Sequence, residues 1–209
     1  MQHTPVFKFG DVTNLGDARF AAGVGAKLVG FNFDTRHAYH INPLKAHEII
    51  QWLSGPQYVA EYRQCDPEQV RALMELIQFD YVLFPFSGKP DPMTALPVPF
   101  IVEIGPEDAA DFDAWVDETE HRPEMIQWTD RRAGAVEELL GDEAYQQQLH
   151  RLNARFPLLL NLPFVPDNVV EAAAKATPYG MSFQASQEEK VGYNDFGHLI
   201  DLVEAFQEM

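Results

Sequence analysis

The chain has 209 residues, of which 46% are hydrophobic and 22% are charged, a composition typical of a globular protein that buries a core. Fifteen Lys and Arg against 32 Asp and Glu give a formal net charge of −17, which argues against nucleic acid or an anionic membrane surface as a partner. The single cysteine, Cys65, excludes an internal disulfide and a metal site built from several cysteines.

Nothing in the sequence predicts contact with a membrane. No run of about 18 apolar residues is present, and the first five residues have neither the basic start nor the apolar stretch of a signal peptide. We therefore expect a cytoplasmic protein that binds no cofactor, acts as a monomer or homodimer, and has a small molecule as its ligand.

Short apolar segments alternate along the chain with longer amphipathic ones. Near-continuous apolar runs are typical of strands that are covered on both faces, as in a parallel sheet. The predicted strands begin near Val6, Lys27, Tyr58, Asp80, Phe100, Met125, Leu158 and Gly180.

The segments between the predicted strands carry helix start signals, in which a capping side chain precedes helix-forming residues or a first-turn proline. One connection differs: residues 86–99 contain four prolines, so we expect the fourth helix to be shortened or missing. The predicted helices follow Thr13-Asn14, Asn42-Pro43 and Asp66-Pro67, and further helices cover residues 108–116, 133–152 with a break at Gly141, 166–176 and 195–206.

Eight strand signals in a chain of this length predict an α/β protein with the architecture of a small (βα)8 TIM barrel. We expect one barrel domain over residues 1–209. A doubly wound open sheet is the alternative, because it is built from the same strand–helix units.

Several short motifs resemble those of one enzyme family. Residues 8–18 read KFGDVTNLGDA, similar to K-I-C-G-I-T-N-x-E-D-A, and residues 23–33 read GVGAKLVGFNF, similar to G-A-D-x-x-G-F-x-F. Residues 66–70, DPEQV, and 165–169, VPDNV, are similar to D-P-E-E-V and T-P-E-N-V. These motifs resemble the phosphoribosylanthranilate isomerase family, small barrel enzymes of tryptophan biosynthesis, and the resemblance implies the barrel fold.

The resemblance also implies where the chemistry of the family would be. Its Amadori rearrangement needs a general base and a general acid on opposite sides of the substrate. The base is a cysteine at the end of the first strand, where this chain has Gly10, and the acid is an aspartate at the end of the sixth, matched here by Trp128. Neither residue can transfer that proton.

The phosphate-binding loops of the family also differ in this chain. Its A-G-G-L after strand seven corresponds to Asn161-Leu162-Pro163-Phe164, in which proline has no amide to donate and the side chains crowd the backbone. Its S-S-G after strand eight corresponds to Gln184-Ala185-Ser186, without the glycine. The family's arginine after strand two corresponds to Tyr39, although Arg36 is near enough to replace it.

These differences predict that the Amadori chemistry is lost and that the chain is a small-molecule-binding or interaction protein. One alternative is an active isomerase with a rearranged site, in which a shifted alignment restores a carboxylate at Asp11 or Asp130. Another is a new enzyme that uses carboxylates at the mouth of the barrel.

Polar side chains at the predicted strand ends define the candidate site, because the carboxyl ends of barrel strands carry the chemistry. Lys8 alternatively forms a buried ion pair with Glu61 or Glu103 and has only a structural role. His37 and His40, three residues apart on a predicted loop near Asp34, suggest a metal site, but we favour a solvated loop and predict no metal. The candidate catalytic residues are Asp11, Glu103 and Lys8, and the candidate ligand contacts are Asn32, Arg36, Glu61, Trp128, Asn161, Gln184 and Ser186.

Overall fold

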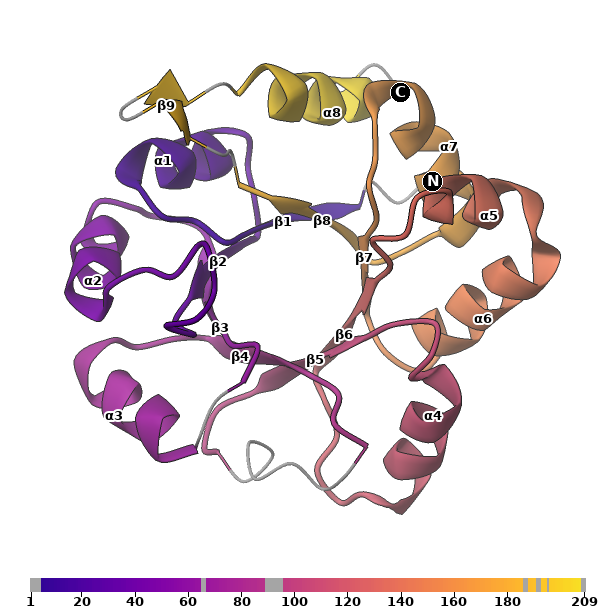
Figure 1. Ribbon diagram of the computed structural model, residues 1–209, viewed down its shortest axis with the longest axis horizontal. Coiled ribbons are helices and arrows are strands. Elements are labelled where there is room, and N and C mark those ends of the chain that lie inside the picture. The colour runs from indigo at the N-terminus through magenta and orange to yellow at the C-terminus, as the bar shows by residue number, and fades with distance from the viewer. Residues whose placement is uncertain are drawn as a thin grey trace.

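Eight parallel strands close into a barrel in the computed structural model, which describes residues 5–64, 67–88, 96–185, 188–190, 193–194 and 196–207 (Figure 1). Each strand pairs with its neighbours in chain order, and β1 closes the ring by pairing with β8 over five residues. This confirms the predicted (βα)8 TIM barrel and each of the eight predicted strands. The strands are β1 Val6–Gly10, β2 Leu28–Asn32, β3 Gln57–Glu61, β4 Tyr81–Pro85, β5 Phe100–Ile104, β6 Met125–Thr129, β7 Leu158–Asn161 and β8 Gly180–Gln184.

Helices surround the barrel, and their starts follow the predicted capping signals (Figure 1). The side chain of Asn14 accepts a hydrogen bond from the amide of Asp17, and Asn42 caps the next helix in the same way. The helices are α1 Leu15–Gly23, α2 Pro43–Gln51, α3 Pro67–Leu76, α4 Ala109–Glu118, α5 Ala135–Gly141, α6 Glu143–Asn153, α7 Pro166–Ala176 and α8 Gly197–Gln207.

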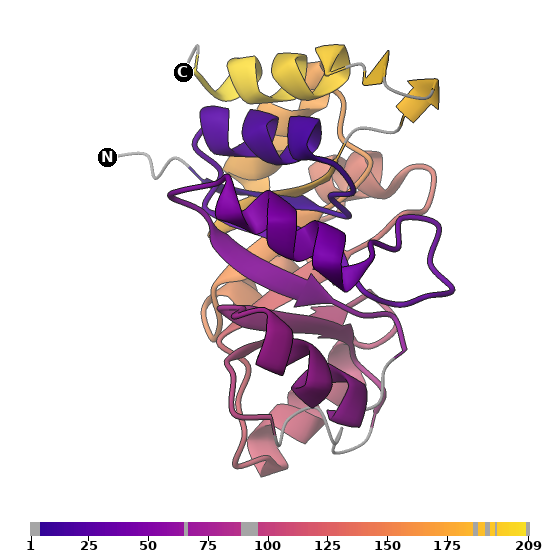
Figure 2. The same cartoon turned by 90° about the vertical axis from the view of Figure 1, so that its left-hand side faces the viewer.

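Three connections depart from a simple alternation of strands and helices. The described residues between β4 and β5, 86–88 and 96–99, contain no helix, in keeping with the predicted shortening or loss of the fourth helix. Between β6 and β7 the chain forms two helices, because Asp142 ends α5 at the predicted break and caps α6 through the amides of Ala144 and Tyr145. A short antiparallel pair, β9 Glu188–Lys190 and β10 Tyr193–Asn194, precedes α8 and was not predicted (Figure 2).

The barrel interior is layered, because alternate residues of each strand point inward. An apolar cluster fills one layer and closes the barrel below the strand ends; it consists of Leu28, Val59, Leu83, Ile101, Met125 and Leu159. The next inward residues along the same strands include Glu61, Glu103 and Gln127, so the layer nearer the carboxyl ends is polar. A larger apolar cluster lies between the strands and the helices. Among the described residues, no helix is long and apolar enough to cross a membrane.

Candidate functional site

The polar layer centres on an ion pair between Lys8 of β1 and Glu61 of β3. Lys8 is only 2% exposed, and its ammonium binds one oxygen of the Glu61 carboxylate. The second oxygen accepts the backbone N–H of Asp11 at 2.9 Å. Both oxygens of Glu61 are therefore used inside the protein, and Lys8 pairs with Glu61 rather than with Glu103.

Glu103 of β5 is the centre of a second set of contacts. One of its oxygens binds the Arg63 guanidinium, and the other accepts Gln127 Nε2 at 2.7 Å and Thr129 Oγ1 at 3.1 Å. Gln127 in turn accepts the hydroxyl of Ser182 on β8 at 3.0 Å. This network connects β5, β6 and β8 across the barrel interior and leaves Glu103 no oxygen without a partner.

Asp11 differs from both glutamates. Its Oδ1 accepts Asn32 Nδ2 at 2.9 Å and lies 3.6 Å from His37 Nδ1, whereas its Oδ2 has no partner among the described residues. Its backbone adopts a left-handed conformation with φ of 57°, uncommon outside glycine and typical of functional sites. Burial, followed by the negative charge of Glu61, raises the pKa of Asp11, although Asn32, His37 and Arg63 act in the opposite direction.

Arg63 follows β3 and binds Glu103, with 28% of its side chain exposed. Burial alone would lower its pKa, but Glu103, Glu61 and Asp11 outweigh burial and raise it. Arg63 therefore remains charged. Sequence reasoning missed this residue, since it lies two positions beyond the end of the strand, and it also missed Gln127, Thr129 and Ser182.

Gly10 lies beside the Lys8–Glu61 pair. A Cβ at position 10 would lie 2.8 Å from Glu61 Oε1 and 2.9 Å from Lys8 Nζ, closer than real Cβ atoms approach other atoms. The ion pair therefore occupies the space that a side chain at position 10 would need.

Trp128 lies outside the barrel interior. It is fully buried between the strands and the helices, where its indole N–H donates to the hydroxyl of Tyr145 on α6 at 2.8 Å. The inward residues of β6 are its neighbours Gln127 and Thr129. We therefore leave Trp128 out of the candidate site.

Asp130 is also turned toward the helices. It accepts hydrogen bonds from Tyr145 at 3.1 Å and from two nitrogens of Arg132 at 2.9 and 2.6 Å. Burial would raise the pKa of Asp130, but the Arg132 and Tyr145 hydrogen bonds outweigh burial and lower it. Asp130 is thus a paired carboxylate with a structural environment, and a poor proton donor.

Two backbone amides among the described residues after β7 and β8 donate to carbonyl groups within the protein. The amide of Phe164 donates to the carbonyl of Leu162, and the amide of Ala185 donates to the carbonyl of Gly10, both at 2.8 Å. Pro163 has no amide, and the side chains of Leu162 and Phe164 are buried. Gln184 is half-buried at the end of β8, and Ser186 lies outside the described residues.

Of the remaining candidates, Asn32 orients Asp11, and Asn161 donates weakly to Thr129 at 3.3 Å. Arg36 is 67% exposed and binds Asp34, whose carboxylate also accepts the amide of Gln64 and so joins two loops. Among the residues that the structure describes, no three His, Cys, Asp or Glu side chains are placed to hold a metal ion.

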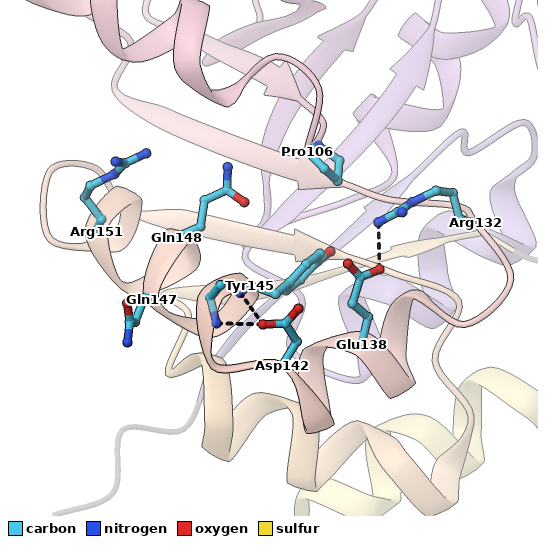
Figure 3. Close-up of a pocket in the computed structure, with 9 residues that line it drawn as sticks. Pro106, Arg132, Glu138, Asp142, Tyr145, Gln147, Gln148 and Arg151 are labelled. Carbon is cyan, nitrogen blue, oxygen red and sulfur yellow. Dashed lines mark hydrogen bonds and ion pairs between the residues drawn. The ribbon is translucent and has the colours of Figure 1, made fainter.

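A separate depression of about 700 Å³ lies on the outside of the barrel, beside α6 (Figure 3). Its two arginines are engaged in ion pairs, Arg132 with Glu138 at 3.0 Å and Arg151 with Asp113 at 2.7 Å. Asp142 is used as the cap of α6. This depression offers no unpaired charge to a ligand, so the barrel mouth is the stronger candidate site.

Known proteins that resemble this chain in sequence or in fold include several phosphoribosylanthranilate isomerases. The chain matches no protein-family model. It is 29% identical over 190 residues to N-(5'-phosphoribosyl)anthranilate isomerase of Syntrophus aciditrophicus, covering 90% of this chain and 81% of the relative. It is 25% identical over 217 residues to the same enzyme of Chlorobium chlorochromatii, covering 97% of each. The crystal structure of phosphoribosyl anthranilate isomerase from Thermotoga maritima superposes with a TM-score of 0.75 at 20% identity, over 98% of this chain and 100% of that one.

Proposed function

Since this chain is a homologue of the phosphoribosylanthranilate isomerases and shares their fold, we propose that it has lost the isomerase reaction and instead binds a small polar molecule without a phosphate group at its barrel mouth. The observation that carries the proposal is the position of the Lys8–Glu61 ion pair. It fills the space beside Gly10, the position at which the resemblance expects the catalytic cysteine.

The acid side of the reaction supports the same proposal. The inward residues of β6 are Gln127 and Thr129, and neither side chain has a proton acidic enough to act as a general acid near neutral pH. Asp130, the nearest carboxyl group in the sequence, is directed to Tyr145 and Arg132 instead of the barrel interior.

Phosphate binding is disfavoured for a separate reason. A phosphate in this type of barrel is held by backbone amides of the loops after strands seven and eight. Here the amides of Phe164 and Ala185 already donate to backbone carbonyls, and Pro163 has none. A ligand of this site must therefore be recognised mainly by side chains.

The proposal is tested by mixing the purified protein with freshly made phosphoribosylanthranilate and following the loss of its fluorescence. We expect no decay above the spontaneous rate at high protein concentration, with the Thermotoga maritima isomerase as the positive control. Circular dichroism of the same sample establishes that the protein is folded. Turnover well above the spontaneous rate would contradict the proposal.

A second candidate function is acid–base catalysis by Asp11 on a different small molecule. The observation that favours it is that Asp11 alone of the three buried carboxyl groups at the mouth has an oxygen without a partner among the described residues, together with a raised pKa. Once a substrate is found by screening, Asp11→Asn should abolish turnover, and an unchanged rate would exclude Asp11.

A further inference from the structure

Two groups at the barrel mouth retain hydrogen-bonding capacity that the described part of the chain does not use. They are the Nη2 and Nε atoms of Arg63 and the Oδ2 atom of Asp11. We propose that these groups together bind a small organic carboxylate, with Arg63 supplying a guanidinium edge and Asp11 a carboxylic acid O–H. The inference rests on the proposed function, because it identifies the chemical class of the phosphate-free ligand.

The guanidinium of Arg63 has the geometry needed to bind a carboxylate. Its Nη1 is committed to Glu103, which fixes the plane of the guanidinium, and the other nitrogens have no hydrogen bond to a described residue. A planar guanidinium edge presents two parallel N–H groups, which match the two oxygens of a carboxylate. The 28% exposure of the side chain leaves it open to a ligand.

Counting charges indicates the state of Asp11. Lys8 and Arg63 are balanced by Glu61 and Glu103, so a charged Asp11 would be a third carboxylate in a buried cluster, with only His37, 3.6 Å from its Oδ1, as a further counter-charge among the described residues. The raised pKa of Asp11 agrees with this count. Asn32 donates to Oδ1, which leaves the proton to Oδ2, the oxygen that has no partner.

The same two groups distinguish a carboxylate from a phosphate. A carboxylate brings one negative charge and two acceptor oxygens, which one guanidinium edge and one O–H satisfy. A phosphate brings more charge and needs backbone amides, and those of Phe164 after β7 and Ala185 after β8 already donate to backbone carbonyls.

Binding should depend on pH, because the proposed hydrogen bond to the ligand carboxylate needs the proton of the Asp11 carboxyl group. Among the described residues, the charged or titratable groups that face Asp11 are Glu61, His37, Arg63 and, through Glu61, Lys8. Between the pKa of Asp11 in the free protein and its higher pKa in the complex, the apparent affinity should fall about tenfold for each pH unit, because each binding event then takes up one proton.

The experiment uses benzoate as the probe in calorimetric titrations between pH 5.5 and 8, with benzamide and inorganic phosphate as matched alternatives. We expect benzoate to bind at least tenfold more tightly than either, with weaker binding at higher pH. Arg63→Gln should weaken benzoate binding at least tenfold, and Arg63→Lys should weaken it while preserving the charge. Asp11→Asn should retain binding but lose its pH dependence, since the amide of asparagine still donates. Arg71→Gln, an exposed position on α3, is the control and should bind as the unmodified protein does.

Circular dichroism of each variant separates loss of binding from loss of folding. Equal affinity for benzoate and benzamide, or full affinity in both Arg63 variants, would overturn the inference. If benzoate fails to bind and phosphoribosylanthranilate is not turned over, the inference fails while the loss of the isomerase reaction stands. If phosphoribosylanthranilate is turned over, the proposed function fails, and the inference, which rests on it, fails too.

Discussion

The buried pair of Lys8 and Glu61 makes each partner dependent on the other. Lys8 is almost completely excluded from water, and its ammonium has no described hydrogen-bond acceptor except Glu61. A buried ion pair adds little net stability compared with apolar side chains of similar size, but the loss of one partner leaves a buried charge without compensation. The pair therefore constrains the sequence more than it stabilises the fold.

Glu61→Gln should lower the free energy of unfolding by about 3 kcal/mol, because Lys8 then keeps a buried charge without a counterion. The double variant Lys8→Met with Glu61→Gln removes both charges and should recover much of that loss. Urea unfolding of the four proteins in the double-mutant cycle measures the coupling. A single-variant loss below about 0.5 kcal/mol, within the usual scatter of surface changes, would contradict the buried pair.

Asp11→Asn should change how stability depends on pH. The pKa of Asp11 in the folded protein is raised above 3.8, mainly by burial and then by Glu61, so the folded state holds the proton more firmly than the unfolded state. This contribution is fully present below about pH 3.8 and is lost as the pH rises through the folded pKa. The asparagine variant should therefore gain stability relative to the unmodified protein between pH 4 and pH 7. Asparagine also tolerates the left-handed backbone at this position, so strain does not confuse the comparison. Parallel pH profiles of the two proteins in thermal unfolding would refute the raised pKa.

At the scale of elements, Tyr145 joins α6 to β6. Its hydroxyl accepts the indole N–H of Trp128 at 2.8 Å and donates to Asp130 at 3.1 Å, and both partners are buried. These contacts fix the helix against the strand on the side away from the barrel interior. They also explain why Trp128 and Asp130 belong to the scaffold of the protein.

Tyr145→Phe should lower the free energy of unfolding by about 1–3 kcal/mol, because the Trp128 indole N–H is then buried without an acceptor. Tyr39→Phe is a matched control, since the Tyr39 hydroxyl makes no hydrogen bond to a described residue. Denaturant unfolding followed by circular dichroism measures both variants. Equal stability of the two variants would show that the Tyr145 hydroxyl contributes nothing to the packing of α6.

The sequence predicted the elements well where local chemistry decides them. Apolar runs marked all eight strands, and the capping residues Asn14 and Asn42 marked helix starts, because these signals act over a few residues. The resemblance did not predict that the Trp128 side chain points toward the helices. An alignment error of one residue in a strand moves a side chain from the face toward the barrel interior to the face toward the helices. The β9–β10 pair lacks a strong apolar alternation and was missed.

At the scale of the whole molecule, closure of the barrel depends on close contact between β8 and β1. Gly180 pairs with Val6, and a Cβ on Gly180 would lie 2.7 Å from the Val6 carbonyl oxygen and 2.9 Å from Leu159. A backbone oxygen cannot move aside as a side chain can, so this glycine is needed for the two strands to meet.

Gly180→Ala should therefore lower the free energy of unfolding by about 1–3 kcal/mol, the usual cost of forcing extra atoms into a packed core. Gly141→Ala, at the end of α5, meets nothing within 4 Å and should be neutral or slightly stabilising, because alanine favours helix. Thermal unfolding of both variants provides the comparison. A destabilised Gly141→Ala alongside an unaffected Gly180→Ala would contradict the closure argument.

The candidate site was predicted in part, for a reason that also belongs to this scale. A barrel brings the carboxyl ends of its strands together, and so the structure places Lys8, Asp11, Asn32, Glu61 and Glu103 in one polar layer. Arg63 was not predictable, because it lies in a loop whose path depends on the fold. Which carboxyl group keeps an unused oxygen depends on distances across the barrel, which no sequence pattern encodes.

The space beside Gly10 has a consequence for how this protein can change by mutation. Replacing Gly10 by cysteine in a single step would place the new Cβ against Glu61 and Lys8, so the variant would have to disturb a buried ion pair before gaining any nucleophile or base. Removing Glu61 first would leave Lys8 uncompensated. The atoms in the way are the ends of two long side chains, so a cysteine at position 10 would be accommodated by moving the ion pair. The effect of a cysteine at position 10 therefore depends on which residues occupy positions 8 and 61, so these three positions are coupled in any path of gradual substitution.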